Sequence, residues 1–237
     1  MIAALRAWSR GRYLRWWAVA GVVATALAAM LVFWTHPVFY AERVFAEASV
    51  AVTSWEAAAI AAGMVLAVMA APRMRSWEHL GRPGLGALAG IGSAAVLAVT
   101  AILGPLAWAV INALPPVLIP FRDRALDPGA RLADIPGAAR LVPYTMANAV
   151  LVTSVALVAI ALLGRFGGVA VALVVFAGLV FAQTQLSHYQ FLLRAPTPQG
   201  LNPAHAVCCA VAAATAVVCW TATKGRLWGS TRPMWRT

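Results

Sequence analysis

The chain alternates between long apolar runs and short segments that gather the charged residues, glycines and prolines. Each apolar run is roughly 20 residues long, the length that crosses about 30 Å of hydrocarbon as an α-helix. Strands of a membrane β-barrel are shorter and alternate between apolar and polar side chains, which these runs do not. The pattern therefore predicts an all-α integral membrane protein.

Polar breaks divide the chain into six predicted transmembrane helices. Pro72 ends the second helix, and a tight turn at 165–168 separates the fourth from the fifth. The third run is long enough to need a tilt or a kink, and we expect the kink at Gly104 and Pro105 because proline removes a backbone hydrogen bond. The predicted helices span about 16–35, 50–71, 86–114, 144–163, 168–187 and 204–222.

Two terminal segments flank this six-helix domain of residues 16–222. In residues 1–15, Ile2, Leu5 and Trp8 recur at helical spacing, while the arginines lie off that stripe. This favours an amphipathic helix lying in the membrane interface. A basic tail is the alternative, because Gly11 weakens a helix. Residues 223–237 are expected to form a basic cytoplasmic tail.

The composition agrees with a membrane protein and excludes a large soluble domain. Hydrophobic residues make up 62% of the chain and charged residues 11%, against about 45–50% and about 25% in soluble proteins. The net charge of +11 has no soluble surface on which to bind nucleic acid, so anionic lipid head groups are the expected partner. All three cysteines fall within the last apolar run, which argues against a disulfide framework.

The distribution of basic residues predicts the orientation. With six helices both termini lie on one side, and 12 of the 18 Lys and Arg residues fall in segments on that side. Cytoplasmic loops carry the excess of positive charge, so both termini are predicted to be cytoplasmic. The preference for arginine over lysine and the abundance of alanine indicate a bacterial chain. We expect a multi-pass protein of the bacterial cytoplasmic membrane.

The predicted membrane interior contains few ionisable groups, which are costly there and usually functional. Glu56 is the exception, about six residues into the second predicted helix. It either forms an intramembrane polar or cation site or lies at the interface, if that helix begins later. No Ser/His/Asp set, CxxC or HExxH motif is present. The chain is therefore expected to be neither an enzyme nor the holder of a motif-defined cofactor.

Three histidines fall at predicted outer helix ends, and one has a cysteine on the same helix face. They are His36, His188 and His205, and Cys208 lies three residues after His205. This placement suggests an outer haem or soft-metal site. The alternative is that polar aromatic side chains favour the interface.

The start of the third predicted helix contains a GxxxG motif, Gly86 and Gly90. Small residues at this spacing let two helix backbones approach closely. The motif is compatible with a dimer seam and equally with packing inside one chain.

The segment 72–83 lies between the second and third predicted helices, on the predicted cytoplasmic side. Trp77 and Leu80 share one helical face, an aromatic and aliphatic pair suited to docking on a partner. The polar side chains around them are Arg73, Arg75, Glu78 and His79. The alternative is an interfacial loop with Trp77 among the lipid head groups.

Four features together resemble a half-size permease of the ABC-2 type, the membrane subunit of an ATP-binding-cassette transporter. They are the amphipathic N-terminal segment, the short cytoplasmic connection at 72–83, the long third helix and the short basic tail. Family members often have an acidic residue followed two positions later by leucine, with a proline close behind. Glu78, Leu80 and Pro83 are similar to this pattern.

The resemblance implies a coupling helix at 73–82 that fits a groove of a separate cytoplasmic ATPase. It further implies two permease subunits per complex, no catalysis by this chain, and alternating access in an exporter. The family commonly carries an external re-entrant element between its fifth and sixth helices, whereas the long external segment here is 115–143. No substrate is therefore carried over.

Two other functions remain compatible with the sequence. One is a non-transporting anchor or assembly subunit of a larger membrane complex, redox-linked through the outer histidines. The other is a small membrane enzyme, which the scarcity of intramembrane polar groups disfavours.

Overall fold

The computed structural model of the protein describes residues 16–32, 37–41, 50–72, 84–113, 138–185 and 201–224. Its elements are α2 (Trp16–Val32), β1 (Pro37–Ala41), β2 (Val50–Thr53), α3 (Ser54–Ala70), α4 (Leu85–Ala113), α5 (Ala138–Gln185) and α6 (Pro203–Thr223). The predicted helical architecture is confirmed for the described residues, apart from one short two-stranded sheet.

The helices carry apolar side chains on their outward faces as well as in the core. Among the described residues, α4, α6 and the 142–182 part of α5 are each long and apolar enough to cross a membrane. α2 and α3 are apolar but shorter. Large apolar side chains such as Ile91 and Phe181 are exposed, which suits contact with lipid rather than water. The chain is a membrane-embedded protein.

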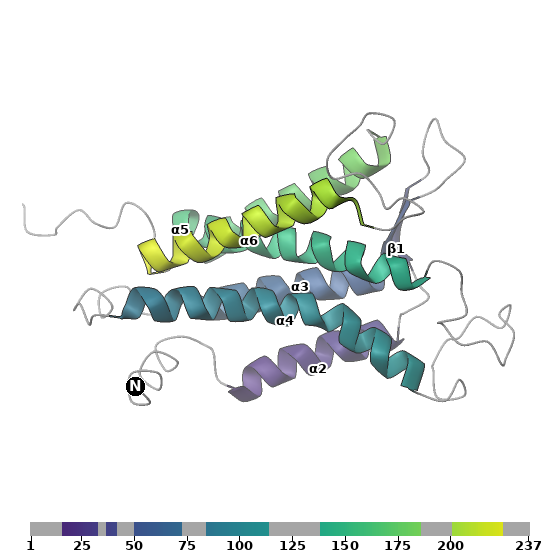
Figure 1. Ribbon diagram of the computed structural model, residues 1–237, viewed down its shortest axis with the longest axis horizontal. Helices are drawn as coiled ribbons and strands as arrows, with labels where there is room; N and C mark the ends of the chain where they lie inside the picture. The colour runs from purple at the N-terminus through teal and green to yellow at the C-terminus, as the bar shows by residue number, and fades with distance from the viewer. Residues whose placement is uncertain are drawn as a thin grey trace, which may run out of the picture.

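α5 is a helical hairpin rather than one straight helix. Its regular geometry is interrupted at Gly164, where φ is 84° and ψ is −179°, a conformation that glycine adopts without a steric penalty. The two halves of α5 run in opposite directions (Figure 1). The sequence placed a turn at 165–168 between two helices, and the break lies one residue before it.

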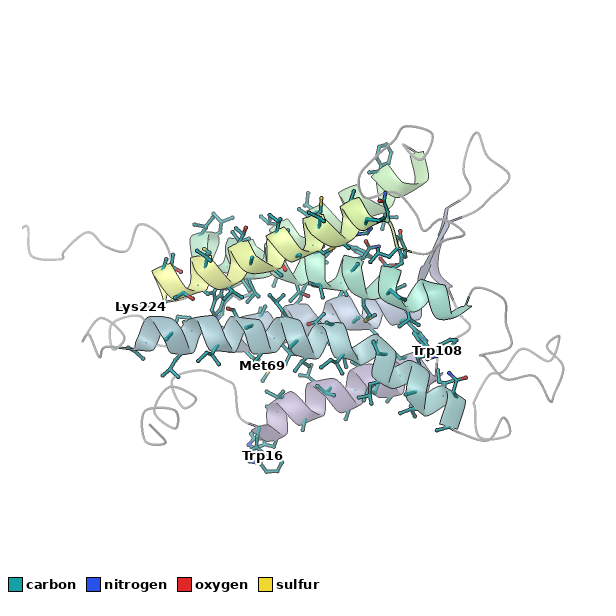
Figure 2. All side chains as sticks on the ribbon, in the orientation of Figure 1. Trp16, Met69, Trp108 and Lys224 are labelled. Carbon is teal, nitrogen blue, oxygen red and sulfur yellow. The ribbon has the colours of Figure 1, made fainter. Side chains whose placement is uncertain are left out.

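The helical segments run up and down between two ends of a bundle. Figure 2 shows Trp16 and Lys224 at one end and Trp108 toward the other. Arg165 lies at the first end, where its guanidinium contacts the carbonyl oxygens of Ala71 and Pro72 after α3. We call this the Arg165 end. The opposite end, which carries β1 and β2, is the sheet end (Figure 1).

The small sheet corrects the predicted start of the second helix. Residues 50–53 were expected to be helical, but they form β2, which pairs antiparallel with β1. β-Branched residues at 50, 52 and 53 favour a strand. The paired strands satisfy each other's backbone groups, and α3 therefore begins at Ser54.

Other helix bounds differ from the predicted ones by smaller amounts. The described part of α2 ends at Val32, and residues 33–35 of the predicted helix lie outside the described ranges. α5 begins at Ala138, so the last residues of the predicted external segment 115–143 are helical, and Pro143 lies inside the helix. α4 contains Pro105, and Figure 1 shows α4 bending in its C-terminal part.

The outgoing and returning halves of α5 form the centre of the packing. α5 contacts α3, α4 and α6, and its described span is the most deeply buried of the three membrane-length helices. One apolar cluster joins α2, α3, α4 and α5. A second cluster joins α3, α4 and α5 to α6 through Trp220, whose indole Nε1 donates to the carbonyl oxygen of Leu157 at 2.6 Å.

The two glycines of the GxxxG motif pack against another helix of the same chain. A Cβ added at Gly86 would lie 2.7 Å from the backbone oxygen of Thr221, and one at Gly90 would collide with the Thr221 side chain. Because these contacts are with α6 of the same chain, the glycines bring α4 and α6 together. The dimer seam that the motif also allowed is not needed to explain them.

The α5 hairpin gives a first test of the packing. An alanine Cβ at Gly168 would lie 2.6 Å from the backbone nitrogen of Ile160, whereas Gly178 has open space around it. Gly168→Ala is expected to destabilise the fold by about 1–3 kcal/mol through overpacking. Gly178→Ala, the matched control in the same half of α5, should be neutral or slightly stabilising because alanine favours helix.

Apparent unfolding temperature in detergent measures both variants. Equal unfolding temperatures for Gly168→Ala and Gly178→Ala would contradict the close approach of the two halves.

Candidate functional site

A buried polar pair lies at the sheet end of the bundle. Glu56 is in the first turn of α3 and is 4% exposed, and Asn148 on α5 is fully buried. Asn148 Nδ2 donates to Glu56 Oε1 at 2.7 Å. The later start of α3 therefore does not release Glu56 to the interface. The carboxyl group is held inside the bundle, between α3 and α5.

Neighbouring tryptophans fix the start of α3 so that Glu56 faces α5. Trp55 Nε1 donates to the carbonyl oxygen of Met30 on α2 at 3.1 Å. The Trp55 ring also meets Trp108 of α4 edge-on, with centroids 6.2 Å apart, a favoured aromatic arrangement. Trp55 is thus held between α2 and α4, and this fixes the rotation of α3 about its axis.

A second polar group of the sheet end joins α5 to α6. The imidazole of His205 is fully buried and meets the Tyr144 ring edge-on at a centroid distance of 5.8 Å. One turn along α6, the buried thiol of Cys209 donates to the carbonyl oxygen of Ala147 at 3.2 Å. Tyr144, Ala147 and Asn148 lie within five residues of α5, so both polar groups share one level of that helix.

Hydroxyl groups mark a second polar level, deeper in the bundle. Thr100 and Thr153 are fully buried, and both approach Gly63, which brings α3, α4 and α5 together. Thr100 Oγ1 donates to the carbonyl oxygen of Val96 at 2.9 Å. Thr153 Oγ1 has no hydrogen-bond partner among the described residues. A buried unsatisfied hydroxyl costs about 1–3 kcal/mol.

Arg165 forms a clamp at the opposite end. Its Nη2 donates to the carbonyl oxygen of Ala71 at 2.8 Å and to that of Pro72 at 3.1 Å. These carbonyls follow the last turn of α3, where a helix leaves acceptors without intrahelical partners. The clamp fastens the end of α3 to the turn of the α5 hairpin, immediately before the segment 73–83.

The structure describes only part of the predicted site set. Glu56 is in contact with Asn148, and His205 is buried while Cys208 is only partly buried. The remaining predicted residues lie outside the described ranges: Arg73, Arg75, Trp77, Glu78, His79 and Leu80 of the coupling segment, and His36 and His188. The roles assigned to them stay predictions.

Four residues of these sites were missed by sequence reasoning. Asn148 is a carboxamide inside an apolar run, a signal that should have marked it as a polar contact between helices. Both Cys208 and Cys209 are spaced to lie near His205 on α6, but Cys209 is the one buried with it, whereas Cys208 is only partly buried. The contacts of Tyr144 and Arg165 depend on the hairpin geometry, and no sequence signal pointed to them.

The donor sets limit the chemistry of these sites. Among the described residues, no three His, Cys, Asp or Glu side chains are placed so that together they could hold a metal ion. A four-ligand zinc site of the structural type therefore has no basis in this part of the chain. The Glu56–Asn148 pair offers a carboxyl group and an amide, which suit a proton or a small cation.

No family model matches the chain, and the comparisons with curated proteins and with solved structures likewise gave no match.

A double-mutant cycle tests the buried pair. Asn148→Leu removes the amide and leaves a buried carboxyl group, so it should lower stability by about 1–3 kcal/mol. Glu56→Gln keeps an oxygen acceptor for Asn148 and should be better tolerated than Glu56→Leu. Combining Asn148→Leu with Glu56→Leu should cost less than the sum of the single changes. Apparent unfolding temperatures in detergent supply the comparison, and strict additivity would show that the two side chains do not interact.

Proposed function

We propose that this chain is the membrane-spanning permease subunit of an ABC-type exporter, driven by a separate cytoplasmic ATPase. The observation that carries the proposal is the Arg165 clamp on the carbonyl groups of Ala71 and Pro72. The clamp ties the start of the segment 73–82 to α5, the helix that contacts α3, α4 and α6. A displacement of that segment would therefore be transmitted through Arg165 to α5 at the centre of the bundle.

Six helical segments support this proposal. The break at Gly164 divides α5 into two segments, and with α2, α3, α4 and α6 these make six helical segments among the described residues. Their ends alternate between the Arg165 end and the sheet end (Figure 1). An even number of spans would place both chain termini on one side, the arrangement expected of a half-size permease.

The charge distribution supports a cytoplasmic Arg165 end. Arg165 lies there, and Lys224 closes α6 at the same end. The segments 1–15, 73–82 and 225–237, which carry the other basic residues of the predicted cytoplasmic side, adjoin helix ends on this side in the sequence. By the positive-inside rule, this end would face the cytoplasm, with the protein in a bacterial inner membrane.

The scarcity of acidic side chains inside the bundle supports an energy source in a partner subunit. Within the described spans Glu56 is the single acidic side chain, whereas proton-driven transporters use chains of ionisable groups. ATP hydrolysis in a partner subunit would supply the energy, and a second permease subunit, identical or related, would complete the translocation path. Alternating access would follow when the ATPase closes against residues 73–82.

Accessibility of introduced cysteines tests the orientation. In a variant without native cysteines, Glu47→Cys lies in the segment between β1 and β2 and Arg226→Cys in the segment after α6. A membrane-impermeant maleimide should label Glu47→Cys in intact cells and Arg226→Cys only after permeabilisation. The reverse pattern would overturn the cytoplasmic assignment of the Arg165 end.

Co-purification tests the partner. A nucleotide-binding protein should follow the tagged chain from its native membrane, and ATPase activity should be present in the complex. Trp77→Ala combined with Glu78→Ala removes the anchor and an acidic contact of the coupling segment, so association should be lost. Glu42→Ala combined with Glu47→Ala, in the segment between β1 and β2, is the matched control and should leave association unchanged.

Two results would count against the permease. Association that survives the Trp77 and Glu78 changes would remove the coupling role of 73–82. A coloured, haem-bearing preparation without ATPase would favour the anchor or assembly subunit of a redox-linked complex instead.

A further inference from the structure

The imidazole of His205 is the least satisfied polar group of the described bundle. The side chain is 0% exposed, and neither Nδ1 nor Nε2 has a hydrogen-bond partner among the described residues. A buried imidazole carries one donor and one acceptor, or two donors when charged. Leaving both nitrogens unsatisfied is costly in an apolar setting. Such a group points to a ligand that binds through nitrogen.

The first turn of α6 holds His205 in a defined direction. Asn202 caps the helix, its side chain accepting from the backbone nitrogen of Ala204 at 3.0 Å, and Pro203 occupies the first helical position. The edge-on contact with Tyr144 then directs the imidazole toward α5. Its orientation is therefore fixed before any ligand binds.

A sulfur donor lies on the same face of α6. Cys209 follows His205 by four residues, is buried, and directs its thiol toward the carbonyl oxygen of Ala147 on α5. Side chains four residues apart on a helix have Cβ atoms about 5–6 Å apart. One metal ion can bridge two donors at this spacing, as helical metal sites with histidines four residues apart show.

We propose that His205 and Cys209 bind one Cu(I) ion between α5 and α6. Imidazole and thiolate are soft donors that suit Cu(I), and this ion accepts two ligands. On binding, the S–H bond of Cys209 breaks and its proton passes to the buffer, while the sulfur forms a bond to copper. The neutral imidazole donates a nitrogen lone pair, and the chelator that carried Cu(I) is released. The positive ion and the thiolate cancel, so the occupied site carries no net charge.

Charge balance favours Cu(I) over other metals. Zn²⁺ with one thiolate and one imidazole would leave a net positive charge in a low-dielectric interior, and its preferred four ligands are not offered here. Hard cations prefer oxygen donors. The site lies at the sheet end, away from the Arg165 clamp, and it does not depend on the permease proposal.

Competition for Cu(I) tests the site. The purified full-length protein in detergent, kept reduced and free of oxygen, is titrated with Cu(I) against a chromophoric Cu(I) chelator. The wild-type chain should withdraw one copper per chain from the chelator. His205→Ala and Cys209→Ser should lose this ability. Cys208→Ser and Cys219→Ser are matched controls on the same helix and should retain it.

A second readout separates metal binding from folding. Ag(I), a redox-inert substitute for Cu(I), should raise the unfolding temperature of the wild type and of Cys208→Ser, but not that of Cys209→Ser. Without metal, Cys209→Ser should unfold close to the wild type, since serine can also donate to the carbonyl oxygen of Ala147. No copper uptake by the wild type, or loss of uptake in Cys208→Ser with retention in Cys209→Ser, would overturn the proposal.

Discussion

The reversal of α5 at Gly164 is the constraint on which the rest of the bundle depends. Only a residue without a Cβ adopts this backbone geometry at low cost, and it turns a segment of 48 residues into two adjacent helical segments. The outgoing half then contributes Tyr144, Asn148 and Leu157 to contacts with α3 and α6. The same turn presents Arg165 to the end of α3. Polar contacts at both ends of the molecule thus follow from one backbone position.

Polar groups in this interior are few, and most of those described join two helices or bond to their own helix. Trp55 and Trp220 each place an indole N–H on the carbonyl oxygen of another helix. Gly104 N donates to the sulfur of Met146 at 3.1 Å, where Pro105 disturbs the regular helix pattern. In the hydrocarbon core no water is present to form hydrogen bonds with such groups. Both ring nitrogens of His205 lack a hydrogen-bond partner among the described residues, which makes it the best marker of a binding site.

The sequence predicted the helices because hydrophobic length is a local property. It also located the turn near Gly164, since arginine and two glycines interrupt an apolar run. It could not predict β2, because a short run of β-branched residues before a helix reads as part of that helix. Glu56 was recognisable as a buried acid, but its partner lies 92 residues away. Long-range pairs such as this, and the choice between Cys208 and Cys209, depend on helix rotation, which hydropathy does not fix.

The unequal lengths of the helices have a mechanical consequence for the surrounding bilayer. α3 has 17 residues, or about 25 Å at 1.5 Å per residue, whereas a hydrocarbon core is about 30 Å thick. α4, with 29 residues, exceeds that thickness. If all six segments cross the bilayer, lipid beside α3 would thin while lipid beside α4 would meet a tilted or bent helix, at a fraction of a kcal/mol per Å of mismatch. The bilayer would therefore be thinner beside the short helix than beside the long one. A change in membrane thickness would alter the mismatch energy differently on the two sides of the protein.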